Sequence, residues 1–375
     1  MTQAPPPSDF TMQRSTRDVG SLQQRLEEWL ATQLPSGAAP QVTFHAGIDS
    51  NGMSSETVIL DVEWTEDGEH RKGEYVARVA PAAEDVPVFP DYALADQYEV
   101  IRLVGELTDI PVPAVRWLEP TGEIIGSPFF LMDRIEGIVP PDVMPYTFGD
   151  NWLFDAPAER SRHLQDATVD VLARLHAIAE PERTLSFLAP RQPGDTLVAR
   201  NLAATRAWYE WAADDLGRSH LVDRALTWLE ANIPETSENV VAWGDARIGN
   251  TMYRDFEPVA VLDWEMATLG PRELDVSWLI FAHRVFQTIS EVMGLDGMPD
   301  FLAEGDVRET YERLTGARLG DLTWYHLYNG VIWCIVFMRT GLRQIHFGEI
   351  EKPDDIETLF HCRPLIEELL AEVGA

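Results

Sequence analysis

One stretch, Val240–Glu265, constrains the fold of this chain more than any other part of the sequence. It opens with a short apolar run that leads into Asp245, and Asn250 follows with four residues between them. Two further apolar segments, joined by a charged turn, place Asp263 just after the second segment. Loops that follow buried strands often hold binding side chains on a rigid scaffold. The stretch therefore predicts that two carboxylates and one amide meet at a single site.

The simplest alternative is that these three side chains only stabilise turns. Asn and Asp frequently do so through hydrogen bonds to the nearby backbone. That explanation would suffice for any one of Asp245, Asn250 and Asp263. It accounts less well for three such residues at this spacing, in loops that follow apolar segments. We therefore interpret the stretch as a functional site.

These residue types suit the transfer of a phosphoryl group with the help of a metal ion. An aspartate can accept the proton of an attacking hydroxyl, and we assign this role to Asp245. Carboxylate and amide oxygens are hard ligands of the kind that Mg²⁺ prefers, which makes Asn250 and Asp263 the expected metal ligands. Glu265 is a further candidate for a second metal ion or its water. Arg247, in the same loop, can neutralise charge on the transferred group or pair with a neighbouring aspartate.

The motif Trp243-Gly244-Asp245-x-x-x-x-Asn250, followed by Asp263-Trp264-Glu265, resembles the catalytic core of the aminoglycoside phosphotransferase family, which shares the protein-kinase-like fold. The segment Thr108–Gly137 is similar to phosphotransferase-like domains that occur fused to acyl-CoA dehydrogenases. The resemblance spans about Gly47 to Leu279 and implies an α+β, bilobal, kinase-like fold. A small N-terminal lobe would carry a five-stranded antiparallel sheet, and a larger C-terminal lobe would be mainly helical.

The sequence itself is consistent with this division into two lobes. Runs of β-branched and aromatic residues predict five strands in the first part of the chain. From about Ala158 onward the apolar residues recur at helical spacing. We expect an N-terminal arm at residues 1–20, an N-terminal lobe at 21–136 and a C-terminal lobe at 137–375. The predicted strands are Val42–Phe44, Thr57–Trp64, Tyr75–Val79, Val115–Leu118 and Phe129–Met132.

The loop between the first two predicted strands is a candidate phosphate-binding loop. Gly52, Ser54 and Ser55 are small enough to let backbone N–H groups approach phosphate oxygens. The loop is not a P-loop, because no Gly-Lys-Ser/Thr follows the second glycine. Most loops of this composition are plain turns, so only the position before the third strand favours the phosphate interpretation.

The resemblance also implies a cation on the third strand that holds the phosphates, and a helix carboxylate that orients it. Arg78 is the candidate cation, where the family often carries Lys. In the following helix, predicted over about Asp91–Leu107, Glu99 is the candidate partner and Gln97 is a competing alignment. Met132 begins the expected hinge, whose backbone would face the adenine ring of the nucleotide.

The family further implies an aspartate that supports the catalytic loop from behind, and Asp275 is the match. Trp243 stands where the family typically has His, which changes the support of the loop rather than its chemistry. The two departures, at Trp243 and Arg78, leave open a catalytically weak or inactive protein that still binds nucleotide. Oligomeric state and the choice between ATP and GTP also stay open.

The charge of the chain narrows the range of partners. Asp and Glu number 62 against 29 Lys and Arg, which gives a net charge of −33. So much negative charge argues against a nucleic-acid or anionic-membrane partner and favours cationic small molecules near the surface. A protein that is simply acidic and soluble is the plainer explanation of the same charge. Glu210 and Asp214, among indole rings, could bind a cationic acceptor, although such a pair more commonly marks a solvated helix face.

Cysteine content and the terminal sequence bear on the compartment. Two cysteines cannot form a disulfide framework, and no secretion signal is visible at the N-terminus. We therefore expect a cytoplasmic protein. The weakly charged run Leu322–Met338 is short for a membrane span and predicts a buried helix.

From these observations we expect an ATP-dependent phosphotransferase that uses Mg²⁺. It would move the γ-phosphate to a hydroxyl of a small molecule, either aminoglycoside-like or another hydroxylated metabolite. The many carboxylates and 12 tryptophans also allow a glycoside hydrolase, but that function gives no reason for the Asp-x-x-x-x-Asn spacing.

Overall fold

The computed structural model describes residues 19–45, 56–81, 85–235 and 238–375. The candidate phosphate loop with Gly52, Ser54 and Ser55 lies outside these residues, as does most of the expected N-terminal arm. The expected division into an arm and two lobes at residues 20 and 136 stays a prediction.

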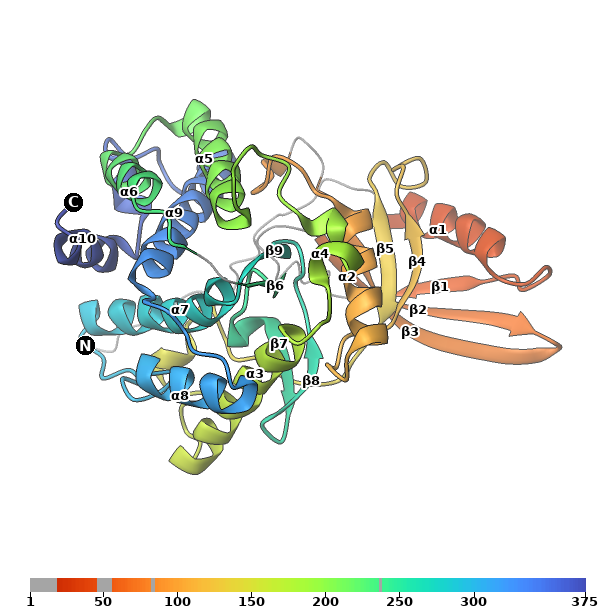
Figure 1. Ribbon diagram of the computed structural model, residues 1–375. Helices are drawn as coiled ribbons and strands as arrows, with labels where there is room; N and C mark the ends of the chain where they lie inside the picture. The colour runs from red at the N-terminus through yellow and green to blue at the C-terminus, as the bar shows by residue number, and fades with distance from the viewer. Residues whose placement is uncertain (1–18, 46–55, 82–84, 236–237) are drawn as a thin grey trace, which may run out of the picture.

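The N-terminal part of the chain forms the expected five-stranded antiparallel sheet, drawn on the right of Figure 1. Its strand order is β1-β2-β3-β5-β4, and all five predicted strands are confirmed. β2 and β3 are longer than predicted because the turn between them, Asp67-Gly68, has positive φ at both residues, which suits a tight hairpin. The strands are β1 (Gln41–Phe44), β2 (Glu56–Glu66), β3 (Glu69–Val79), β4 (Val115–Glu119) and β5 (Phe129–Asp133).

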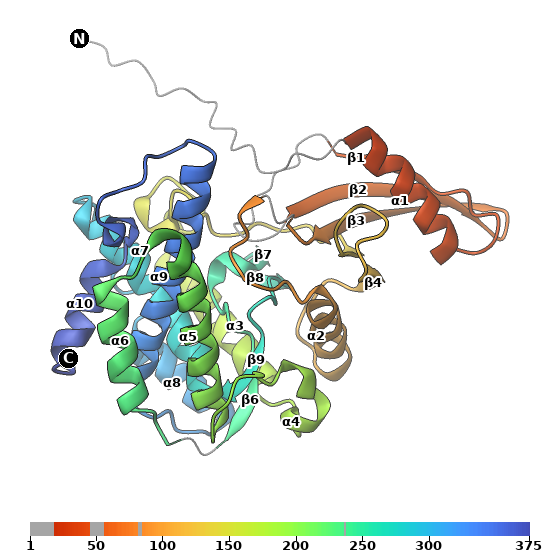
Figure 2. The ribbon, with the colours of Figure 1, turned by 90° about the horizontal axis from the view of Figure 1, so that it is seen from above.

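Two helices cover the two faces of this sheet, as the paired views of Figures 1 and 2 show. Helix α1 (Val19–Gln33) packs on one face, where Trp29 meets Phe129 edge to face with ring centroids 4.8 Å apart. Helix α2 (Leu94–Leu107) packs on the other, where Tyr98 contacts Phe130. Because side chains alternate along a strand, β5 contributes to two separate cores. The core beneath α2 continues into the helical lobe.

The rest of the chain is mainly helical and lies on the left of Figure 1. Its helices are α3 (Ala158–Leu175), α4 (Pro181–Thr184), α5 (Leu197–Leu216), α6 (His220–Ala231), α7 (Glu273–Val292), α8 (Glu304–Thr315), α9 (Thr323–His346) and α10 (Arg363–Glu372). Short 3-10 turns are η2 (Tyr146–Phe148), η3 (Ser186–Leu188), η4 (Ile248–Asn250) and η5 (Ile356–Leu359). The predicted buried helix is α9. Among the described helices, none combines the length and the hydropathy that crossing a bilayer requires.

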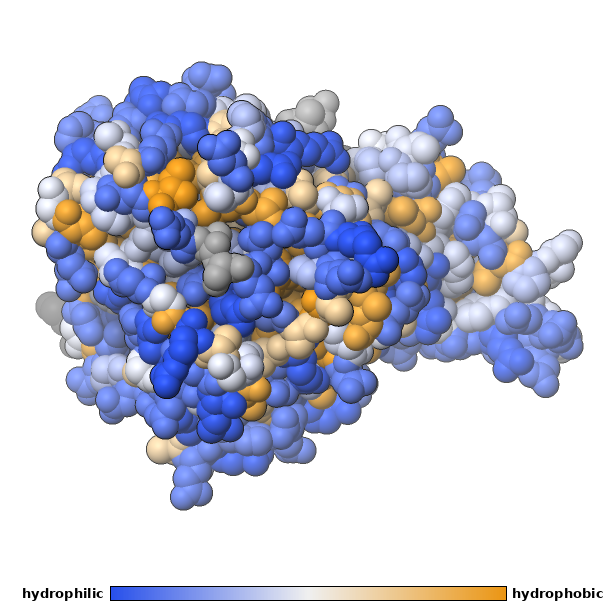
Figure 3. Space-filling model, in the orientation of Figure 1, coloured by the Kyte–Doolittle hydropathy of each residue, from blue (hydrophilic) through white to orange (hydrophobic). Residues whose placement is uncertain are grey.

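Two small antiparallel sheets sit between the large sheet and the helices. β6 (Asn239–Ala242) pairs with β9 (Thr268–Pro271), and β7 (Thr251–Arg254) pairs with β8 (Glu257–Val261). β6, β7 and β8 are the apolar segments of the stretch that opened the sequence analysis, and β9 follows that stretch. The outer face in Figure 3 is largely hydrophilic with small hydrophobic groups, in keeping with the net charge of −33.

Candidate active site

The loop that carries Asp245 leaves β6 through a turn that only glycine can make. Gly244 has a φ of +87°, and a Cβ atom there would overlap the backbone carbonyl of Met266. A larger residue would therefore push the loop away from the segment that follows β8. This constraint explains why a glycine precedes Asp245.

A buried aspartate holds the same turn from behind. Asp275, on α7, is fully buried, and its oxygens accept hydrogen bonds from the backbone N–H of Trp243 at 2.7 Å and of Gly244 at 2.9 Å. His176 lies 3.0 Å from the same carboxylate, and its other ring nitrogen contacts the hydroxyl of Tyr311 at 2.7 Å. The supporting position expected for Asp275 is confirmed, and His176 is part of that support.

The carboxylate of Asp245 is oriented by three neighbouring side chains. Trp278 Nε1 donates to Oδ1 at 2.8 Å, and Asn250 Nδ2 donates to Oδ2 at 2.7 Å. Arg247 Nε lies 3.0 Å from Oδ1 and 3.2 Å from Oδ2. The structure thus brings together Asp245, Arg247 and Asn250 as expected, while Trp278 was not singled out from the sequence.

Asp263 returns to this loop through the β7–β8 hairpin. The indole Nε1 of Trp243 donates to the carbonyl of Leu262 at 2.9 Å and approaches that of Asp263 at 3.2 Å. The backbone N–H of Leu262 also donates to the carbonyl of Asn250 at 2.8 Å. Trp243 therefore ties the segment that carries Asp263 to the loop that carries Asn250, through an N–H donor.

Arg78 reaches this segment from β3 of the large sheet. Its Nη2 donates to Asp263 Oδ1 at 2.9 Å and lies 3.6 Å from Glu265. Burial lowers the pKa of Arg78, but the charges of Asp263 and Glu265 outweigh that effect, so the net shift is upward. The expected cation is therefore present, with two carboxylates of the candidate metal motif as its partners.

The expected pairing of Arg78 with Glu99 is wrong. Glu99 forms an ion pair with Arg102 at 2.6 Å, on a half-exposed face of α2. Gln97, the competing alignment, is buried and lines the same cleft as Arg78. Since successive residues turn by about 100° around a helix, the two positions face different sides of α2.

A cleft of about 400 Å³ lies between the large sheet and the β7–β8 hairpin. This volume is within the range of small-molecule sites. Met132 and the hinge after β5 line one wall, and Leu262 and Trp264 line another. Arg78 and Asp263 are among its polar lining residues, so the cleft adjoins the candidate metal ligands.

The donor atoms at this site fit Mg²⁺. Within the described residues, the Asn250 side chain hydrogen-bonds only through Nδ2, which leaves its oxygen for a metal ion. Among the contacts of the described residues, Asp263 uses Oδ1 alone, toward Arg78. No three His, Cys, Asp or Glu side chains of the described chain cluster as metal ligands. Magnesium commonly binds proteins through one or two side chains together with substrate phosphates.

Besides Trp278, a second site residue was missed in the sequence. Asp142, in the segment after β5, forms a short ion pair with Nη1 of Arg247. It is 105 positions from Arg247, in a Pro-rich segment without periodicity, so no spacing rule pointed to it.

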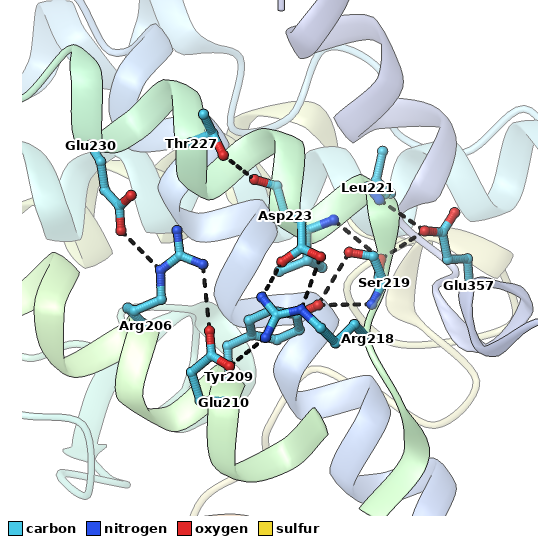
Figure 4. A network of polar contacts seen from close by, with 11 residues as sticks. Arg206, Tyr209, Glu210, Arg218, Ser219, Leu221, Asp223, Thr227, Glu230 and Glu357 are labelled. Atoms are coloured by element: carbon cyan, nitrogen blue, oxygen red, sulfur yellow. Dashed lines mark hydrogen bonds and ion pairs between the residues drawn. The ribbon is translucent and has the colours of Figure 1, made fainter. Parts of the chain in front are cut away.

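Glu210, one of the two carboxylates considered for a cationic acceptor, already has arginine partners. Figure 4 shows Glu210 between Arg218, with which it forms a short ion pair, and Arg206 at 3.6 Å. Asp215 pairs with Arg339 at 2.6 Å. Glu210 and Asp215 therefore have arginine partners from this chain.

Comparisons with known proteins agree with the fold. The model of a family described as the phosphotransferase enzyme family matches residues 50–304. The probable acyl-CoA dehydrogenase IBR3 of Arabidopsis thaliana is 27% identical over 277 residues, which cover 68% of this chain but only 31% of that protein. The match thus spans about a third of that relative.

Solved structures give the same picture. A protein from Ralstonia eutropha, described as a candidate aminoglycoside phosphotransferase, superposes with a TM-score of 0.64 at 19% identity and covers 93% of this chain and 97% of its own. Aminoglycoside 2'-phosphotransferase-IIIa, solved with GDP, gives a TM-score of 0.51 at 13% identity and covers 94% and 99%. At such identities the likeness concerns the fold. Together with the family match, it shows that this chain belongs to the phosphotransferase enzyme family.

Proposed function

We propose that this protein transfers the γ-phosphate of ATP, bound with Mg²⁺, to a hydroxyl group of a small molecule. The observation that carries the proposal is the convergence of Asp245, Asn250 and Asp263 beside the cleft. Asn250 bonds the carboxylate of Asp245 directly, and its backbone carbonyl accepts from the residue before Asp263. An arrangement that served only turns would not need to join the side chains of Asn250 and Asp245 while the backbone of Asn250 holds the segment of Asp263.

In this proposal the adenine lies in the cleft against Met132 and the hinge, and the phosphates extend toward Arg78. Asp245 orients the acceptor hydroxyl and takes its proton as the bond to phosphorus forms. Because the transition state of phosphoryl transfer is loose, orientation matters more than strong basicity. Arg247 stabilises charge on the transferred group. When bound, Mg²⁺ would be held by Asn250 and Asp263 and would neutralise the phosphate oxygens.

The acceptor is proposed to be a hydroxylated metabolite rather than an aminoglycoside. The acidic face on α5 would be the natural contact for a polycation, yet Glu210 already has arginine partners. The matched relative is named for acyl-CoA dehydrogenase chemistry, which makes a hydroxyacyl thioester one candidate.

The test is a screen of the purified protein for Mg²⁺-dependent formation of ADP or GDP. The panel holds hydroxyacyl thioesters, amino alcohols and aminoglycosides. Asp245→Asn should lower transfer by about 10³-fold while nucleotide affinity stays nearly constant. Asp263→Ala should weaken binding of the metal–nucleotide complex.

Asp306→Asn serves as a matched control, because Asp306 forms an exposed ion pair with Arg162 on the outside of the helical lobe. Unchanged turnover in Asp245→Asn would remove that residue from the mechanism. Nucleotide binding without transfer to any acceptor would instead favour the inactive, nucleotide-binding alternative.

A further inference from the structure

A carboxylate outside the catalytic loop is fixed against Arg247. Asp142 lies in the segment between β5 and η2, and its Oδ2 accepts a hydrogen bond from Nη1 of Arg247. The backbone on both sides of Asp142 is anchored. Ile138 exchanges two hydrogen bonds with Tyr253, at 3.0 and 2.7 Å, and Tyr146 N–H donates to the carbonyl of Pro141 at 2.8 Å. Asp142 therefore has little freedom to leave Arg247.

We propose that Asp142 is a positioning residue, which holds Arg247 so that the guanidinium contacts Asp245 through Nε and keeps Nη2 directed to the transferred phosphoryl group. This inference rests on the proposed function. Within the described part of the chain, Nη2 of Arg247 has no hydrogen-bond partner, whereas Nε and Nη1 are both engaged. One nitrogen of a planar, charged fork is thus left for a ligand.

The lone pairs of Asp245 show why this restraint matters. A carboxylate offers about four acceptor positions on its two oxygens. Trp278 and Asn250 each use one, and the single proton of Arg247 Nε is shared between the two oxygens, so one position stays open for the acceptor hydroxyl. Arginine readily forms a two-pronged pair with a single carboxylate. Arg247 released from Asp142 would take that geometry on Asp245 and occupy the position that the acceptor hydroxyl needs.

Gly249 gives independent support for a built contact. A Cβ atom at this position would lie 2.5 Å from Asp142 Oδ1 and 2.6 Å from Arg247 Nη1. Its φ lies outside the left-handed region, so the backbone itself would accept alanine. The lack of a side chain is therefore explained by the space that Asp142 and Arg247 occupy.

The electrostatic environment agrees with a strong pair. Burial lowers the pKa of Arg247, but the charges of Asp142 and Asp245 outweigh it, so the net shift is upward. Oδ1 of Asp142 is buried and has no hydrogen-bond partner within the described residues. A buried acceptor without a partner is unfavourable, so the contact with Arg247 must offset that loss.

The experiment compares Asp142→Asn and Gly249→Ala with two controls, Asp306→Asn and Val143→Ser. Val143 is adjacent to Asp142 and its side chain is exposed. Both test variants should lower kcat by about 10²-fold and leave the KM for nucleotide within about twofold, because a displaced group acts on the transition state. Asp142→Glu should restore part of the rate. Asp142→Asn combined with Arg247→Lys should be no slower than Arg247→Lys alone, because both changes act through the same contact.

A second readout does not need the acceptor. ADP with Mg²⁺ and aluminium fluoride imitates the transferred phosphoryl group, and Asp142→Asn should bind it about tenfold more weakly while binding ADP normally, since one charge-assisted contact is lost. Equal affinity of wild type and Asp142→Asn for this complex overturns the inference, as does additive loss in the double variant. Absence of transfer by the wild type counts instead against the proposed function, so the two failures can be told apart.

Discussion

The two sides of the cleft hold their charged groups in different ways. On the helical side, Asp245 receives hydrogen bonds from three side chains of its own lobe, and the buried Asp275 fixes the turn before it. On the sheet side, Arg78 reaches across to Asp263 and Glu265 through a single nitrogen, 185 positions away from Asp263. The acid–base half is therefore preorganised, whereas the phosphate half depends on how the sheet and the helical lobe meet.

The largest expected effect tests the preorganised acid–base half of the cleft. In Asp275→Asn, the new NH₂ group would face a buried backbone N–H of Trp243 or Gly244, so a donor would meet a donor. Loss of such a buried, charged acceptor should destabilise the fold by about 3 kcal/mol. Urea denaturation, with Asp306→Asn as the control, measures the change. A loss of unfolding free energy no larger than that of Asp306→Asn would show that Asp275 does not hold the turn before Asp245. The proposed difference between the two sides of the cleft would then be wrong.

A second prediction concerns pH. His283, on α7, is buried, and it contacts the Tyr146 hydroxyl at 2.8 Å and the Met298 carbonyl at 3.0 Å. Burial lowers its pKa to about 4, although the bond to Met298 acts in the opposite direction. A carbonyl can only accept, so Nε2 must carry the proton of the neutral ring and Nδ1 accepts from Tyr146.

The sign follows from proton binding in the two states. Unfolded histidine binds a proton below about pH 6.5, while His283 in the fold does so only near pH 4. The contribution of His283 to the free energy of unfolding is therefore complete at neutral pH and is lost as the pH falls from about 6.5 toward 4. The loss should reach about 2 kcal/mol at pH 5. His283→Gln should flatten the dependence between these values. As the pH falls, amide hydrogen exchange should become faster first at η2 and α7 and later in β5. A simultaneous increase in the helical lobe and in β5 would contradict the difference between the two lobes.

The parts that the sequence predicted are those set by local spacing. Asp245 and Asn250 belong to one loop, so their separation of five positions in the sequence already limited the distance between their side chains. A short hairpin then returns Asp263 to the same loop. The strands followed from apolar runs, and Asp67-Gly68 could have extended the second and third, because Asp-Gly is a strong hairpin signal.

The predictions that failed concern residues whose position depends on how a helix is rotated about its axis or on contacts between distant parts of the sequence. Choosing between Gln97 and Glu99 required the rotational setting of α2 on the sheet, which a shift of two positions changes by about 200°. Arg102, three positions after Glu99, offered an i, i+3 partner that could have been weighed. Asp142 meets Arg247 only because the hinge segment folds back along β7, and nothing in its local sequence encodes that path.

The smallest expected effect tests the phosphate half of the cleft, on the side of the large sheet. Both carboxylate contacts of Arg78 involve Nη2 alone, so toward Asp263 and Glu265 it acts more as a point charge than as a fork. Lysine supplies such a charge with a shorter reach. Arg78→Lys should therefore weaken Mg²⁺–nucleotide binding only about threefold, and Arg78→Gln by about tenfold or more, because a charge at a partly buried site is lost. Calorimetric titration measures both, with Arg134→Gln, whose partner Glu74 is exposed, as the control. A loss in Arg78→Lys as large as in Arg78→Gln would mean that the sheet side also needs exact geometry, and the two halves of the cleft would then be equally preorganised.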